Sequence, residues 1–120
     1  FTLKQLFDMP VDDLIIYLNK LCTFDIPKRV ETIEDMQQAS NILGRIGPIY
    51  AWLINMEMRA NINKRRLKKD NKEDYEKALI QEAVFSAFGK QVNIIYNTVS
   101  RMVTIKQQIN QELRMLGNVT

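Results

Sequence analysis

The chain has 120 residues, which corresponds to one domain with a single hydrophobic core. Hydrophobic residues make up 46% and charged residues 26%, values that exclude an intrinsically disordered chain. The single cysteine excludes an intramolecular disulfide, and the absence of histidine removes the commonest catalytic base and zinc ligand. No apolar run reaches the roughly 18–20 residues of a membrane span, so we expect a cytoplasmic protein without a membrane partner.

Positive charge is concentrated in the middle of the chain. Residues 1–35 carry four basic and seven acidic side chains, residues 36–72 carry eight and two, and residues 73–120 carry five of each. The three segments therefore have net charges of −3, +6 and 0. A local excess of this kind is typical of a surface that binds anions.

Two short helical segments are predicted near the N-terminus. Residues 2–9 form one or two turns, and Asp8 followed by Pro10 predicts a capped start for a second helix that ends near Cys22. Its apolar face repeats at spacings of three and four and consists of Leu14, Ile15, Leu18, Leu21 and Cys22. We expect Cys22 to be a small buried hydrophobic residue rather than a nucleophile.

A long helix is predicted from about Thr32, because Asp35 stands three residues on in a capping-box position. Its apolar residues alternate spacings of four and three, which is a heptad seam with Asn63 as its polar member. The seam consists of Ile42, Ile46, Ile49, Leu53, Met56, Ala60 and Leu67. Gly44 and the Gly47-Pro48 pair predict a kink or a break, because proline lacks the N–H of a helical hydrogen bond.

The segment Asp70-Asn71-Lys72 predicts a turn, after which the longest helix runs from about Lys72 to Leu116 and ends at Gly117. Its seam consists of Phe85, Phe88, Val92, Ile95, Val99, Met102, Ile109, Leu113 and Leu116. Lys106 is the charged residue in this seam, and it either sets the register or lines a channel in an oligomer; we favour the first. We therefore predict one all-α domain over residues 1–120: an antiparallel, coiled-coil-like hairpin (31–120) with a shorter N-terminal helix and linker (1–30) packed against it.

No pattern in the sequence indicates catalysis. The segment Gly44-x-x-Gly47 lacks both the preceding strand and the Lys-Ser/Thr of a phosphate-binding loop. Glu73, Asp74 and Glu76 cluster after the turn, but the first turn of a helix favours such charges in any case. We therefore predict a protein that is not an enzyme and that needs no metal or cofactor.

The predicted tip of the hairpin carries the strongest functional signal. Seven cations, which we call the basic tip, lie there: Arg59, Lys64, Arg65, Arg66, Lys68, Lys69 and Lys72. Phosphate contacts by six or seven cations would supply most of a nonspecific affinity for nucleic acid. The alternative is a solvated helix end whose cations pair with Asp70, Glu73, Asp74 and Glu76. Tyr75 is the one aromatic residue beside the tip that could stack on a base, whereas we expect Trp52 in the core.

Between Gln37 and Asn110 four short sequence segments follow one another along the chain. They are Ala39-Ser40-Asn41, then Tyr50-Ala51-Trp52-Leu53, then Lys64-Arg65-Arg66-Leu67-Lys68-Lys69, and finally Tyr96 through Arg101 to Lys106. This order resembles that of the UvsY-type recombination mediators of bacteriophages. The resemblance implies a ring-forming oligomer that binds single-stranded DNA and helps to load a recombinase onto strands covered by single-strand-binding protein.

Together these features predict a non-catalytic accessory protein of phage recombination or replication that binds single-stranded nucleic acid. The expected partners are single-stranded DNA, with RNA as the alternative, further copies of the chain, and a recombinase or single-strand-binding protein. The competing hypothesis is a small helical adaptor or inhibitor, such as a phage factor that acts on a host or defence nucleoprotein complex. Changing Lys64, Arg65 and Arg66 together to glutamate would abolish nucleic-acid affinity under the first hypothesis and only partner binding under the second.

Overall fold

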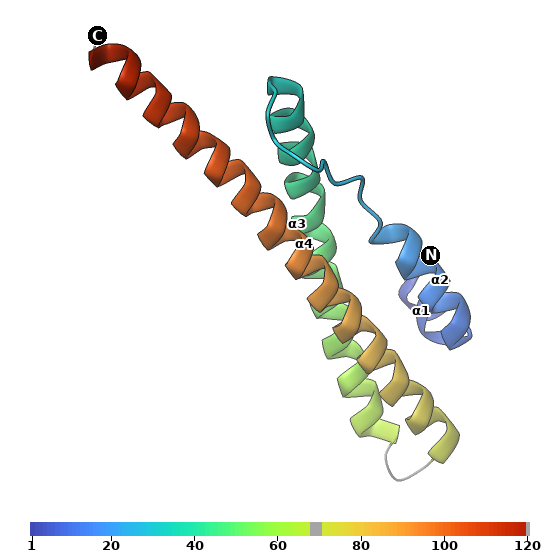
Figure 1. Ribbon diagram of the computed structural model, residues 1–120. Helices are drawn as coiled ribbons and strands as arrows, with labels where there is room; N and C mark the ends of the chain where they lie inside the picture. The colour runs from blue at the N-terminus through green and yellow to red at the C-terminus, as the bar shows by residue number, and fades with distance from the viewer. Residues whose placement is uncertain (68–70, 120) are drawn as a thin grey trace.

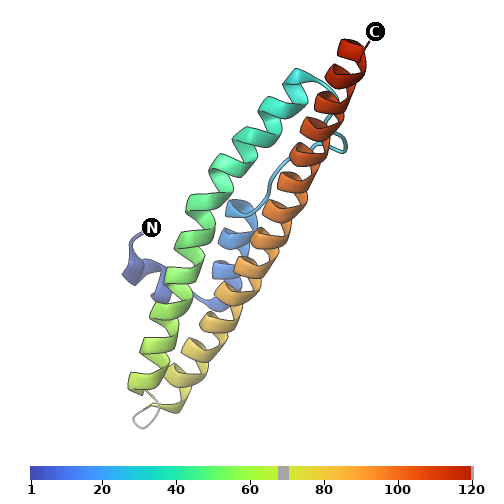
Figure 2. The same ribbon diagram turned by 90° about the vertical axis from the view of Figure 1, so that its left-hand side faces the viewer.

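The computed structural model describes residues 1–67 and 71–119, and these form helices without any strand. Two short helices, α1 (Leu3–Asp8) and α2 (Val11–Leu21), precede two long ones, α3 (Ile33–Leu67) and α4 (Lys72–Val119). The long helices lie side by side and antiparallel, with α2 packed against them (Figures 1 and 2). The predicted all-α hairpin with a shorter N-terminal helix is confirmed.

The molecule is a rod with extents of 76 × 21 × 19 Å. Its length comes from α4, because 48 helical residues at 1.5 Å each span about 72 Å. The 35 residues of α3 span only about 52 Å, so α4 is the longer arm of the hairpin. In Figure 1 the C-terminal end of α4 separates from α3 and projects away from the rest of the chain.

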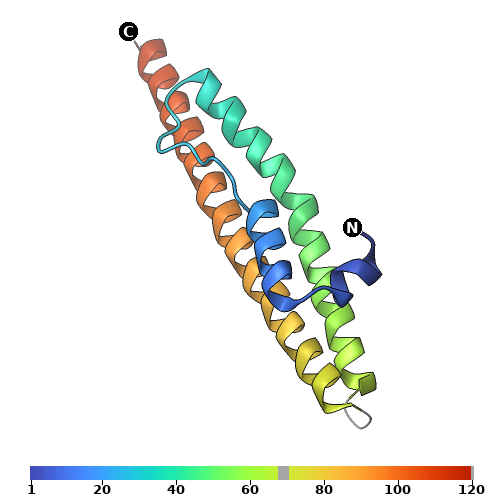
Figure 3. The same cartoon turned by 90° about the vertical axis from the view of Figure 1, so that its right-hand side faces the viewer.

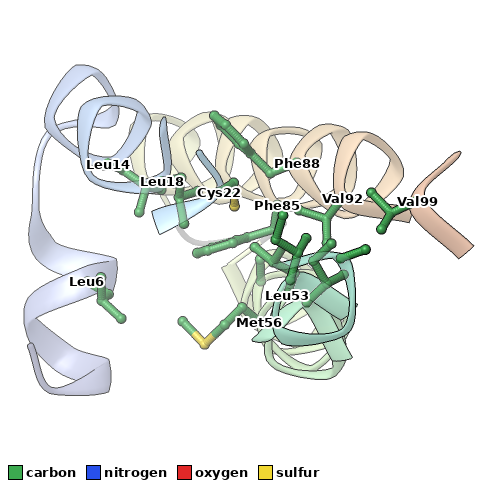
Figure 4. Packing of buried hydrophobic residues seen from close by; sticks show 14 of the residues in the cluster. Leu6, Leu14, Leu18, Cys22, Leu53, Met56, Phe85, Phe88, Val92 and Val99 are labelled. Atoms are coloured by element: carbon green, nitrogen blue, oxygen red, sulfur yellow. The ribbon is translucent and has the colours of Figure 1, made fainter. Parts of the chain in front are cut away.

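The core lies along the heptad seams of the two long helices (Figure 4). The buried apolar residues of α3 are Ala39, Ile42, Ile46, Leu53, Met56 and Ala60, and those of α4 are Ala78, Phe85, Phe88, Val92 and Val99. Phe85 is fully buried, and its ring meets the ring of Trp52 edge to face with centroids 6.1 Å apart. Trp52 itself is half-buried and packs against the core, as predicted, although part of it stays exposed.

The N-terminal helices cover one side of this pair, with α2 lying along it and α1 beside α3 (Figure 3). Leu14 and Leu18 of α2 are fully buried, and so is almost all of Cys22, which follows the helix. Burial raises the pKa of the Cys22 thiol, because the thiolate would lose its hydration. Cys22 is thus the buried hydrophobic residue that the sequence predicts.

The start of α3 is capped as predicted. The backbone N–H of Asp35 donates to the Thr32 hydroxyl at 3.1 Å, and the Asp35 carboxylate accepts from the Thr32 N–H at 3.1 Å. The carboxylate also accepts from the backbone N–H of Glu31 at 3.0 Å. These hydrogen bonds to the charged form lower the pKa of Asp35, with the bonds from Glu31 and Thr32 as the main causes.

Two predictions about helix ends are wrong, and so is the predicted break at Pro48, whereas the alternative of a kink there stays a prediction. The helix α3 continues through Pro48, because the proline and Gly44 lie on its exposed side while Ile46 and Leu53 bury the opposite side against α4. Asp8 does not cap α2: it ends α1, and Pro10 occupies the cap position of α2, where its carbonyl accepts from the Leu14 N–H. Gly117 does not end α4, which continues to Val119.

Candidate nucleic-acid interface

The structure places the described cations of the basic tip at the closed end of the hairpin (Figure 1). Arg59, Lys64, Arg65 and Arg66 lie in the last turns of α3, and Lys72 is the first residue of α4. Lys68 and Lys69 lie outside the described residues. The described cations of the tip therefore come from two helix ends, the C-terminal end of α3 and the N-terminal end of α4.

Asn71 organises the start of α4 next to the tip. Its side-chain oxygen accepts from the backbone N–H groups of Glu73 and Asp74 at 3.1 and 3.3 Å. Its amide nitrogen donates to the Asp74 carboxylate at 2.8 Å. This capping satisfies backbone donors that a helix start otherwise leaves unpaired, so α4 begins at Lys72, directly after Asn71. The predicted turn also includes Asp70, which lies outside the described residues.

Lys64 does not face solvent with the other cations. Its ammonium nitrogen lies 2.7 Å from Glu82 Oε2, and the two side chains are only 20% and 22% exposed. The other oxygen of Glu82 accepts from the Asn61 amide at 2.9 Å. Hydrogen bonds from Lys64 and Asn61, together with the charges of Lys64 and Arg65, lower the pKa of Glu82. Lys64 thus joins α3 to α4, which the sequence did not indicate.

The remaining cations of α3 lie on two different sides of the helix. Arg65 lines a hollow of about 420 Å³ together with Glu57 and Glu82, so acidic groups lie close to it. Arg59 and Arg66 line a second hollow, of about 410 Å³, between α3 and α1. The basic tip is therefore not one uniform patch.

Lys4 is a cation that sequence reasoning missed. It belongs to α1, yet it lines the same hollow as Arg59 and Arg66, which come more than fifty residues later in the chain. Lys77 of α4 also reaches this region, where its ammonium donates to the Asp8 carbonyl at 3.1 Å. No local sequence pattern predicts the position of Lys4 or the hydrogen bond of Lys77, because both depend on where α1 docks.

The alternative, in which the cations of the tip pair with Asp70, Glu73, Asp74 and Glu76, is not observed for the described residues: Lys64 pairs with Glu82 instead, and Asp70 lies outside the described residues. Within residues 1–67 and 71–119 the ion pairs are Lys64 with Glu82 and Arg29 with Glu31. Neither Glu73 nor Asp74 is paired with a described cation of the tip, and Asp74 instead bonds to Asn71. The predicted neutralisation by the acidic start of α4 is therefore not observed among these residues.

Neither a metal site nor a membrane span is found among the described residues. Over the described residues no group of three or more Asp, Glu, Cys or His side chains is placed to hold a metal ion. None of the helices, as far as they are described, contains a stretch that is long and apolar enough to cross a membrane. Tyr75, the aromatic residue beside the tip, is half-buried, so it offers little ring surface for stacking.

Comparisons with known proteins leave the interface to be interpreted from its geometry. No family model matches the chain, and neither a curated protein nor a solved structure shows significant similarity to it. The resemblance to UvsY-type mediators therefore stays a prediction.

Proposed function

We propose that this protein is a non-catalytic accessory factor that binds single-stranded nucleic acid through its basic tip. One observation carries the proposal: Arg59, Arg65, Arg66 and Lys72 are exposed at one end of the rod, and none is in an ion pair within the described residues. An anionic partner would offset the mutual repulsion of these charges. The resemblance to UvsY-type mediators adds the setting, which is phage recombination or replication on single-stranded DNA.

The helix dipoles explain part of this charge but not all of it. Cations in the last turn of α3 are favoured by the negative end of that helix, so Arg65 and Arg66 have a structural justification. Lys72 has the opposite placement, because it occupies the positive end of α4. A cation in that position is disfavoured within the hairpin, which supports a role in binding an external anion.

Titration of a labelled single-stranded oligonucleotide, followed by fluorescence anisotropy, tests the proposal. We expect binding of about micromolar affinity or tighter at low salt, weakening steeply between about 50 and 200 mM salt. Each phosphate contact contributes about 0.7 to the slope of log affinity against log salt for a single strand. Changing Arg65 and Arg66 together to glutamate should therefore reduce the magnitude of the slope by about 1.4.

The matched control changes Lys90 and Arg101 to glutamate. Both side chains are exposed on α4 away from the tip, so the net charge changes equally while the tip stays intact. We expect this variant to keep more affinity than the tip variant. Equal losses in the two variants, or no binding by the wild-type protein at low salt, would overturn the proposed function.

Self-association is a second part of the proposal, and it rests on the end of α4. The heptad seam continues through Ile109, Leu113 and Leu116, whose side chains are 44%, 60% and 67% exposed. Among residues 72–117 of α4, Val99 is the last buried one. Apolar residues at this spacing are what one coiled-coil helix presents to another. We propose that a second copy of the chain covers them.

The same exposed seam is the observation that favours the competing function, an adaptor that binds another protein. Light scattering coupled to size exclusion distinguishes the two. A wild-type oligomer that a Leu113→Asp, Leu116→Asp variant converts to monomer supports self-association. A wild-type protein that is monomeric at all concentrations contradicts self-association. The exposed seam would then be a binding surface for a different protein, as the adaptor function requires.

A further inference from the structure

The hollow between α1 and α3 combines positive charge with exposed apolar surface. Its cations are Lys4, Arg59 and Arg66, and its apolar side chains include Leu3 and Ile62, which are 42% and 48% exposed. Asp8 is the acidic group in its lining, so the hollow keeps a net positive charge. Its volume of about 410 Å³ lies within the range of about 300–1,000 Å³ that is typical of small-ligand sites.

The α1 wall of this hollow is held in place by contacts to α4. The buried Gln81 side chain donates to the Phe7 carbonyl at 2.8 Å, and the Phe7 ring meets the Phe85 ring edge to face at 6.1 Å. Lys77 adds its bond to the Asp8 carbonyl. The α1 side of the hollow is therefore already docked on α4 without a ligand, so a ligand need not order it on binding.

The cations that line the hollow have hydrogen-bond donors that are not used within the described structure. Arg59 uses its Nε–H on the Asn55 side chain at 3.2 Å, which leaves the terminal N–H groups of its guanidinium. None of Lys4, Arg59 and Arg66 is in an ion pair among residues 1–67 and 71–119. Guanidinium groups match the geometry of phosphate oxygens, and an ammonium adds a point charge.

We propose that this hollow is a nucleotide-binding subsite in which a single strand continues from the basic tip. Lys4, Arg59 and Arg66 contact phosphates, and a base or sugar lies against Leu3 and Ile62. The inference rests on the proposed function and deepens it: it adds α1 to the interface, and it assigns an apolar contact to the bases where the tip itself offers little aromatic surface.

Two oligonucleotides and three variants test the subsite in the full chain. Lys4→Ala removes one phosphate contact, so the magnitude of the salt slope should fall by about 0.7, whereas Lys20→Ala should leave it unchanged. Lys20 is the matched control, because it is an exposed lysine at the end of α2 that does not line the hollow. Thermal unfolding followed by circular dichroism confirms that each variant is folded.

An abasic strand of the same length reports on the apolar contact. The wild-type protein should bind it more weakly than the normal strand, and a Leu3→Ser, Ile62→Ser variant should lose this preference. If Lys4→Ala binds like the wild-type protein while the Arg65, Arg66 reversal does not, the subsite is refuted and the proposed function stands. If the wild-type protein binds no strand at low salt, both are refuted.

Discussion

Replacing Lys64 with methionine should destabilise the hairpin by about 1–2 kcal/mol. The Glu82 oxygen that faces Lys64 is inaccessible to solvent and has no hydrogen-bond partner in the described structure apart from this ion-pair contact of 2.7 Å. Leaving a buried acceptor unpaired costs about 1–3 kcal/mol. The lower part of that range applies, because both side chains are about one-fifth exposed and Asn61 still donates to the second oxygen.

Urea unfolding of a double-mutant cycle measures this interaction directly. The cycle contains the wild-type protein, Lys64→Met, Glu82→Leu and the double variant, in which neither charge is left without its partner. We expect the double variant to be more stable than the sum of the single losses predicts, by about 1 kcal/mol or more. Lys90→Met, at an exposed position of α4, should change the free energy of unfolding by less than about 0.5 kcal/mol.

The pH dependence gives an independent check on the same pair. Because the pKa of Glu82 is lowered in the folded state, its stabilising contribution is complete above the ordinary glutamate pKa of about 4.3 and is lost as the pH falls through the folded value. Glu82→Gln should therefore lose less stability than the wild-type protein over this acidic range. A coupling energy near zero, with identical acid profiles, would refute the ion pair.

Two predictions concern the core that supports the interface. Gly89→Ala should stabilise the protein by about 0.5–1 kcal/mol, because alanine favours a helix interior over glycine. The added Cβ would lie 4.0 Å from Leu53 Cβ, which is an ordinary van der Waals contact. A lower melting temperature than that of the wild-type protein would show that the α3–α4 packing has no room for the methyl group. Phe85→Ala should lower the free energy of unfolding, measured with urea, by about 3–5 kcal/mol, because the ring is fully buried between Phe7 and Trp52. A loss below about 1 kcal/mol would contradict that packing.

Much of the fold could be read from the sequence, because it depends on local periodicity. The four-and-three spacing around Ile46, Leu53 and Phe85 identifies the buried faces of α3 and α4, and these residues are fully buried. The capping box at Thr32 marks the start of α3 through side chains that are neighbours in the chain, and α4 begins at Lys72, as the sequence predicts. The break predicted at Pro48 does not occur, since packing against α4 supports the helix on both sides of the proline.

The arrangement of the interface depended on contacts between residues far apart in the chain. The sequence predicts seven cations near one turn. It does not show that Lys64 forms an ion pair with Glu82, because that contact depends on how α3 packs against α4. It did not show that Lys4 lines the same hollow as Arg66, since this follows from the docking of α1 through a hydrogen bond between residues 74 positions apart. Local periodicity specifies which face of a helix is buried, whereas only tertiary packing decides which charges are paired and which remain exposed.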